Sequence, residues 1–213
     1  MRLFVSLILL VLCQSLSAQF GVSSFYNMNE LRTRDYPGMV RDQVLPYENS
    51  LEGAVHYWFR LPKKRIEFQP TVYFAKQLHD RPFNANEIGI QFKTNVYVFD
   101  LGTDCNCPTF GKQGPQLQKG LFIQLSPGVA SHQFSGQDRS TLFTVGGGVG
   151  LDFGVSNLLT LTPLAAVRYG ISNLQTGITF TDDTNTPLED VKINLTTFQL
   201  GLQATFRLDK RHY

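Results

Sequence analysis

The sequence predicts an all-β fold, an eight-stranded antiparallel up-and-down transmembrane β-barrel. Three observations support this prediction. Apolar and polar residues alternate through eight segments, as they do in strands with one apolar and one polar face. After the N-terminus, no apolar run reaches the roughly 18 residues that a membrane helix needs. Charged residues make up 17% of the 213-residue chain, whereas roughly 25% is usual in soluble domains.

The first 18 residues are typical of a secretory signal peptide. Arg2 supplies a positive charge, an apolar stretch follows over 3–12, and small residues lead to a predicted cleavage site after Ala18. The apolar stretch is short for a membrane anchor. Cys13 raises the alternative of a lipoprotein, which Leu12 disfavours because those signals have a small residue there. We therefore expect an exported chain, 19–213, that forms one barrel domain.

The eight predicted strands follow one another closely, so each can pair with its neighbour in sequence. Closing such a sheet into a barrel removes its exposed edges. Pro70, Pro127 and Pro163 lie inside the alternating segments, and we expect a local bulge at each because proline donates no ladder hydrogen bond. The predicted strands lie near 19–28, 51–61, 65–78, 87–99, 120–132, 141–155, 158–171 and 195–208.

The strength of the alternation increases along the chain. It is weakest in 19–28, where only Phe20, Val22 and Tyr26 mark the apolar side. In the last segment every even-numbered position from 198 to 208 is apolar, and the odd positions hold threonine, glutamine, glycine or arginine. Between these two, the apolar side includes Leu51, Val55, Tyr57, Phe59, Ile66, Phe68, Pro70, Val72, Phe74, Ile88, Ile90, Phe92, Val96, Val98, Leu121, Ile123, Leu125, Val129, Phe143, Val145, Val149, Leu151, Phe153, Leu159, Leu161, Val167, Tyr169 and Ile171.

The apolar face could meet either lipid or the core of a soluble lipocalin-like ligand-binding barrel. The composition of the polar face favours the interpretation that the apolar face meets lipid. The polar face mixes charges of both signs with many glycines, which would weaken the strands of a soluble barrel. An eight-stranded barrel is just wide enough for side chains to fill it. We therefore expect inward charges to form an ion-pair network, with a continuous pore as the alternative. The predicted lumen network comprises Glu52, His56, Arg60, Glu67, Glu87, Lys93, Asp152, Arg168 and Arg207.

With its signal peptide, eight alternating segments and final strand over 198–208, the chain resembles the small eight-stranded outer-membrane β-barrel proteins of Gram-negative bacteria, the OmpA-barrel and OmpX type. The resemblance covers nearly the whole mature chain. It implies location in the bacterial outer membrane, outer-membrane lipid and the barrel-assembly machinery as partners, and a monomer. Such families usually end at the closing aromatic residue, whereas "DKRHY" follows here, so either Phe206 or Tyr213 could be the assembly signal.

Connection lengths predict the orientation. The long polar connections 29–50 and 173–193 fall at one end of the barrel, and the tight turns 61–64 and 155–157 fall at the other. Short turns of such barrels face the periplasm, so the long loops are expected outside. The connection 102–119 is a long one on the short-turn side.

That long connection contains Cys105 and Cys107. In an oxidising compartment these two could form a strained local disulfide, although we favour a turn without chemistry. Two cysteines are too few for a closed zinc site, which takes four ligands. No cofactor or metal site is predicted.

The pattern predicts a non-enzymatic outer-membrane protein that acts in envelope structure, or in adhesion or recognition through an unknown extracellular partner at 29–50 and 173–193. A net charge of +2 without a long basic run gives no indication of nucleic acid binding. One alternative is a lipid-modifying enzyme with Ser131 and His132 at the outer rim, near His79 and Asp80. The other is the soluble barrel.

Overall fold

The computed structural model describes residues 19–33, 49–61, 64–78, 85–99, 120–134, 139–156, 158–172, 180–181, 187–188 and 193–207. The predicted signal peptide and the predicted disulfide between Cys105 and Cys107 lie outside these ranges, as do most of the connections. Within them, no helix is long and apolar enough to cross a membrane.

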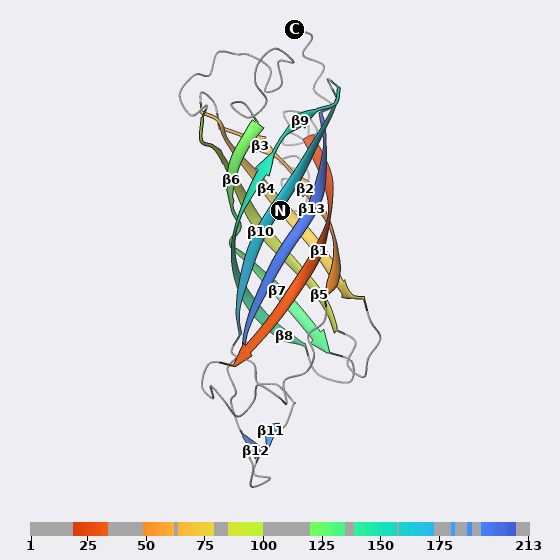
Figure 1. Ribbon diagram of the computed structural model, residues 1–213, viewed down its shortest axis with the longest axis vertical. Coiled ribbons are helices and arrows are strands. Elements are labelled where there is room, and N and C mark those ends of the chain that lie inside the picture. Colours follow the sequence, from red (N-terminus) through yellow and green to blue (C-terminus); the bar gives the residue numbers. More distant parts are fainter. Residues whose placement is uncertain are drawn as a thin grey trace, which may run out of the picture.

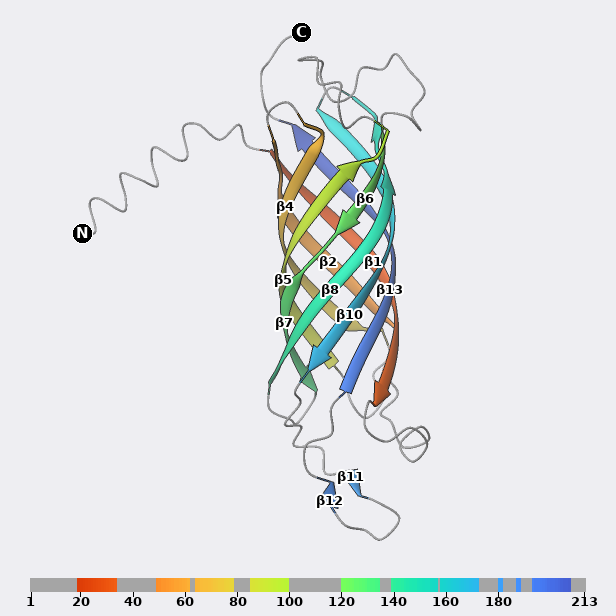
Figure 2. The ribbon, with the colours of Figure 1, turned by 90° about the vertical axis from the view of Figure 1, so that its left-hand side faces the viewer.

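The strands form one antiparallel sheet that closes on itself (Figures 1 and 2). β3, β7 and β9 continue β2, β6 and β8 after short interruptions, so the described chain forms eight barrel strands. The eight-stranded antiparallel barrel predicted from the sequence is confirmed. Its elements are β1 (Gln19–Thr33), β2 (Ser50–Tyr57), β3 (Phe59–Arg60), β4 (Ile66–Gln77), β5 (Ala85–Tyr97), β6 (Leu121–Leu125), β7 (Gly128–Phe134), β8 (Ser140–Leu151), β9 (Phe153–Gly154), β10 (Leu159–Ser172) and β13 (Ile193–Arg207).

Pairing between the first and last strands closes the barrel. β1 pairs with β13 from Gln19 opposite Arg207 to Thr33 opposite Ile193. We call the end at Gln19 and Arg207 the turn end and the opposite end the loop end. The short strands β11 (Phe180–Thr181) and β12 (Pro187–Leu188) pair with each other beyond the loop end, as Figure 1 shows. β1 extends past the predicted limit of 28, so the first strand projects further toward this end.

The predicted bulges at the three prolines are absent, and each proline instead marks an interruption of the ladder. Pro127 lies between β6 and β7, Pro70 lies opposite Tyr57 at the end of β2, and Pro163 lies opposite Leu151 at the end of β8. The register is the same on both sides of each interruption, so no extra residue is inserted. A missing proline N–H is therefore accommodated without a shift of register, and beside Pro127 Ser126 and Gly146 still exchange backbone hydrogen bonds.

Burial alternates with the same period as the sequence. Along β5 every odd-numbered residue from Ala85 to Tyr97 is buried, while the even-numbered residues are exposed or half-buried. Large inward side chains are accommodated by glycines on neighbouring strands. A Cβ added to Gly89 would lie 2.6 Å from the Tyr73 ring, and one added to Gly150 would meet the Phe122 ring. Because the inward glycines have no side chain, they leave the room that these aromatic rings occupy in a narrow barrel.

Aromatic rings form a row on the outer wall near the turn end. Phe59 lies 5.4 Å from Phe68 between ring centroids, and Phe68 lies 5.5 Å from Phe92. Phe20 and Phe206 pair at 5.7 Å where the first and last strands meet. This is the arrangement of an aromatic girdle at a membrane interface.

Candidate functional site

The lumen brings together seven of the nine residues predicted for its charge network. Their side chains are all buried: Glu52, His56, Glu67, Glu87, Lys93, Asp152 and Arg168. The side chains of Arg60 and Arg207, at the ends of β3 and β13, lie outside the described part of the structure. The buried charges divide into one cluster nearer the loop end and another nearer the turn end.

Arg168 of β10 is the centre of the loop-end cluster. Its Nη1 lies 3.0 Å from Glu52 Oε2 of β2, and its Nη2 lies 3.1 Å from Glu87 Oε1 of β5. The guanidinium carbon also lies 4.6 Å from the centroid of the Tyr73 ring on β4. One cation therefore joins strands from opposite sides of the barrel, and the planar, forked arginine head suits two carboxylates at once.

Further side chains contact both carboxylates. Glu52 Oε2 accepts hydrogen bonds from Asn27 Nδ2 at 3.1 Å and from Gln199 Nε2 at 3.0 Å. Glu87 Oε1 accepts one from the Tyr73 hydroxyl at 2.7 Å. His132 Nδ1 lies 3.4 Å from Glu87 Oε2. Buried charges are costly unless they are paired and hydrogen-bonded, and each carboxylate of this cluster has Arg168 and at least one hydrogen-bond donor as partners, although Glu52 Oε1 accepts no hydrogen bond.

Tyr97 of β5 is the centre of the turn-end cluster. Its hydroxyl lies 3.0 Å from Glu67 Oε2 and 2.5 Å from Asp152 Oδ2, while Thr162 donates to the other oxygen of Asp152 at 2.5 Å. The Arg65 guanidinium lies 4.6 Å from the centre of the Tyr97 ring. Asp152 occupies the interruption between β8 and β9, so its buried contacts hold the strand where the ladder is incomplete.

Apolar and aromatic side chains also pack in the lumen, beside the turn-end cluster. Phe25, Tyr97, Phe122 and Leu164 pack together in its interior. The Lys93 ammonium lies 4.9 Å from the centre of the Phe25 ring, and His56 Nε2 lies 3.5 Å from Thr205 Oγ1. These contacts join side chains of different strands inside the barrel.

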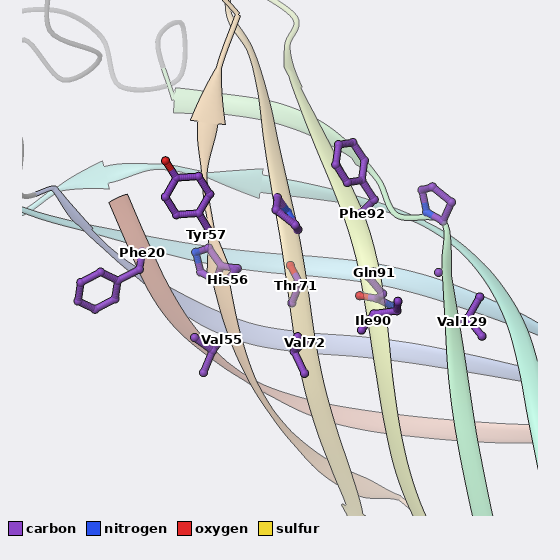
Figure 3. A pocket seen from close by; sticks show the side chains of 13 residues that line it. Phe20, Val55, His56, Tyr57, Thr71, Val72, Ile90, Gln91, Phe92 and Val129 are labelled. Atoms are coloured by element: carbon purple, nitrogen blue, oxygen red, sulfur yellow. The ribbon is translucent and has the colours of Figure 1, made fainter. Parts of the chain in front are cut away.

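The outer wall of the barrel is apolar, in contrast to the charged and polar lumen. Apolar side chains stand exposed along every strand of the belt, with exposed fractions of 59% for Val55, 60% for Ile90 and 54% for Leu200. A hollow of 560 Å³ lies in this wall where β2, β4, β5 and β7 run side by side. Figure 3 shows Val55, Val72, Ile90 and Val129 in a row across these four strands.

Two residues of the alternative enzyme site, Ser131 and His132, lie in the described part of the structure. Ser131 and His132 are successive residues of β7, and His132 is buried in the lumen while Ser131 lies on the opposite face. A nucleophile needs its base within hydrogen-bond reach, and these two side chains point to opposite faces of the strand. His79 and Asp80 lie outside the described residues. Among those described, no group of three or more histidine, cysteine, aspartate or glutamate side chains could hold a metal ion.

Several residues that organise the lumen were missed in the sequence. Tyr73 and Tyr97 hold the glutamates, and Arg65 lies over Tyr97. Both tyrosines occupy the inward parity of their segments, so the alternation could have found them. They were overlooked because tyrosine suits an interfacial girdle as well as a polar interior.

No family model matches the chain, and no curated protein is significantly similar to it. Solved structures with a similar barrel include that of Neisserial surface protein A, at 12% identity and a TM-score of 0.48, covering 88% of this chain and 96% of that one. The attachment invasion locus protein Ail of Yersinia pestis is 12% identical, with a TM-score of 0.43 and coverage of 90% and 100%. The N-terminal β-barrel domain of Pseudomonas aeruginosa OprF is 14% identical, with a TM-score of 0.41 and coverage of 89% and 98%. The barrel assignment rests on the strand pairing of this chain itself.

Proposed function

We propose that the chain is a non-enzymatic protein of the bacterial outer membrane, a rigid lipid-embedded barrel with a filled lumen that acts through the loops at its loop end, in adhesion or recognition, or in envelope structure. The observation that carries the proposal is the inverted polarity of the barrel. Apolar side chains point outward on every strand, and charged and amide side chains point inward.

Lipid is the solvent that fits this outer wall. Soluble monomers rarely expose apolar patches larger than a few hundred Å², whereas here the exposed apolar residues encircle the barrel from β1 to β13. A lipocalin-like barrel would place these side chains inside. Closure also pairs the barrel edges through β1 and β13, as a strand structure in lipid requires.

The filled lumen supports a scaffold rather than a wide channel. Arg168, Glu52 and Glu87 connect across the interior, and Phe25, Tyr97 and Phe122 pack together inside it. Function would then reside in what the scaffold displays. Exposed loops on a rigid scaffold are where recognition residues usually sit, and the long connections 29–50 and 173–193 join strands at the loop end.

Insertion and conductance together test the proposal. The purified protein should insert into lipid vesicles and migrate differently on a detergent gel before and after boiling, because the closed sheet unfolds cooperatively. In planar bilayers it should show no sustained conductance of porin size. Remaining in the aqueous phase after vesicle addition would overturn the membrane assignment. A steady open-channel current from the folded protein would overturn the proposal that the lumen is filled and would leave the membrane assignment intact.

A further inference from the structure

The outer wall contains a track on β2, β4 and β5 that differs from the rest of the belt. It begins near the loop end with a hollow of 330 Å³, whose lining includes Leu51, Gly53, Phe74 and Lys76. The hollow described above, beside Val55 and Val72, continues along the same strands. Gly53 pairs with Phe74, and two residues further along β2 Val55 pairs with Val72, so the two hollows follow each other.

Gly53 opens the upper part of this track. It points outward between Leu51 and Val55 on β2, and a Cβ added there would meet nothing within 4 Å. The residue beside it on β1 is the small Ser24. These two adjacent small residues leave a slot beside Leu51 and Phe74 that a linear apolar chain can enter.

The cation Lys76 lines the slot at the loop end, and two amides follow beside it on the next two strands. Lys76 points outward and makes no ion pair among the described residues. Its cross-strand neighbour is Asn86, whose own neighbour is Gln133, and Gln133 accepts a hydrogen bond from Arg139 Nε at 3.2 Å. We call Lys76, Asn86, Gln133 and Arg139 the donor rim. Such a row of donors suits the oxygens of a phosphate.

The track has the depth of one lipid leaflet. From Lys76 to Pro70 it follows β4 for six residues, or about 20 Å at roughly 3.3 Å per residue. With a strand tilt of about 40° this corresponds to a depth of about 15 Å, and half of the roughly 25 Å apolar band is about 12 Å. A lipid with its headgroup at the donor rim would therefore place an acyl chain along both hollows.

From this geometry we propose that the track binds one phosphate-bearing acylated lipid of the leaflet at the loop end. The phosphate lies at the donor rim, beside Lys76, and an acyl chain lies over Gly53 and between Val55 and Val72. This inference rests on the proposed membrane function. In the outer leaflet of a Gram-negative outer membrane, the lipid of this chemistry is the phosphorylated glycolipid lipid A.

Native mass spectrometry of the purified barrel in detergent tests the site, with bisphosphorylated lipid A, the same lipid without phosphates, and phosphatidylcholine as probes. The barrel should retain one bisphosphorylated lipid A in preference to the other two lipids. Lys76→Gln should weaken retention roughly five-fold, the usual effect of one cation at an anionic lipid surface. Gly53→Leu fills the slot and should weaken it on the order of tenfold, the loss of about two buried methylene contacts.

A matched control lies on another part of the belt. Gly147 of β8 also points outward, and a Cβ added there would meet only a backbone oxygen at 3.7 Å, so Gly147→Leu should retain lipid A as the unchanged protein does. Equal retention of phosphatidylcholine, or equal losses in the two leucine variants, would overturn the site and leave the membrane assignment intact. Failure of the unchanged protein to insert into vesicles would instead overturn the proposed function.

Discussion

Removing Arg168 should destabilise the barrel more than removing any exposed charge. Arg168→Met keeps an apolar stem of similar length but leaves Glu52 and Glu87 without their shared cation. Both carboxylates are almost completely buried, with side-chain exposures of 1% and 4%. Breaking a buried pair by removing one partner costs about 3–5 kcal/mol, against a total stability of roughly 5–15 kcal/mol for an ordinary domain.

The loss of stability should come from the two buried carboxylates that no longer have a cation beside them, rather than from lost packing. Adding Glu52→Gln and Glu87→Gln to Arg168→Met removes the uncompensated charge, so most of the stability should return. Urea unfolding of the protein in lipid vesicles, followed by fluorescence of its one tryptophan, measures both differences. Lys64→Met, at an exposed lysine, is the control and should change stability by no more than about 0.5 kcal/mol. If Arg168→Met behaves like this control, or if the triple variant is no more stable than the single one, the reasoning about the loop-end cluster fails.

Three further predictions test other parts of the account. Leu200→Arg places a cation in the lipid belt and should cost about 2–4 kcal/mol if it lies near the bilayer midplane, whereas Gln199→Arg points inward and should cost less; equal losses on folding into vesicles would contradict the parity. Tyr97→Phe removes the hydroxyl shared by two buried carboxylates and should cost about 1–3 kcal/mol in urea unfolding, and an unchanged midpoint would show that the hydroxyl is dispensable. In a background without native cysteines, an impermeant thiol reagent should label a cysteine at Asp183 but not at Asn106 on intact cells, and the opposite result would invert the predicted sidedness.

The alternation of apolar and polar residues was sufficient to predict the fold, because successive side chains of a strand point to opposite faces. A residue's parity within its segment therefore determines whether it faces lumen or lipid. That is why Glu52, Glu87 and Arg168 could be assigned to the lumen from the sequence. Closure by β1 and β13 followed from the even number of strands.

Which lumen side chains contact one another depends on the register between neighbouring strands, and the alternation of residues does not determine that register. Whether Arg168 reaches Glu52, Glu87 or both depends on how far each strand is shifted against the next. The prolines were misread for a similar reason, since a missing N–H can be accommodated by a bulge or by an unpaired residue, and only the neighbouring strands decide. The slot at Gly53 arises from two small residues adjacent in space but far apart in the chain.

A nitroxide scan along β5 tests the central claim most directly, that the apolar face meets lipid and the polar face lines the lumen. Single cysteines would be spin-labelled at Ile90, Gln91, Phe92, Lys93 and Thr94 in vesicles, and collisions with oxygen, which concentrates in lipid, compared with those of a polar nickel complex. The even-numbered positions should be accessible to oxygen and shielded from nickel, and the odd-numbered positions should be shielded from oxygen. The opposite phase, or accessibility without a period of two, would contradict the account.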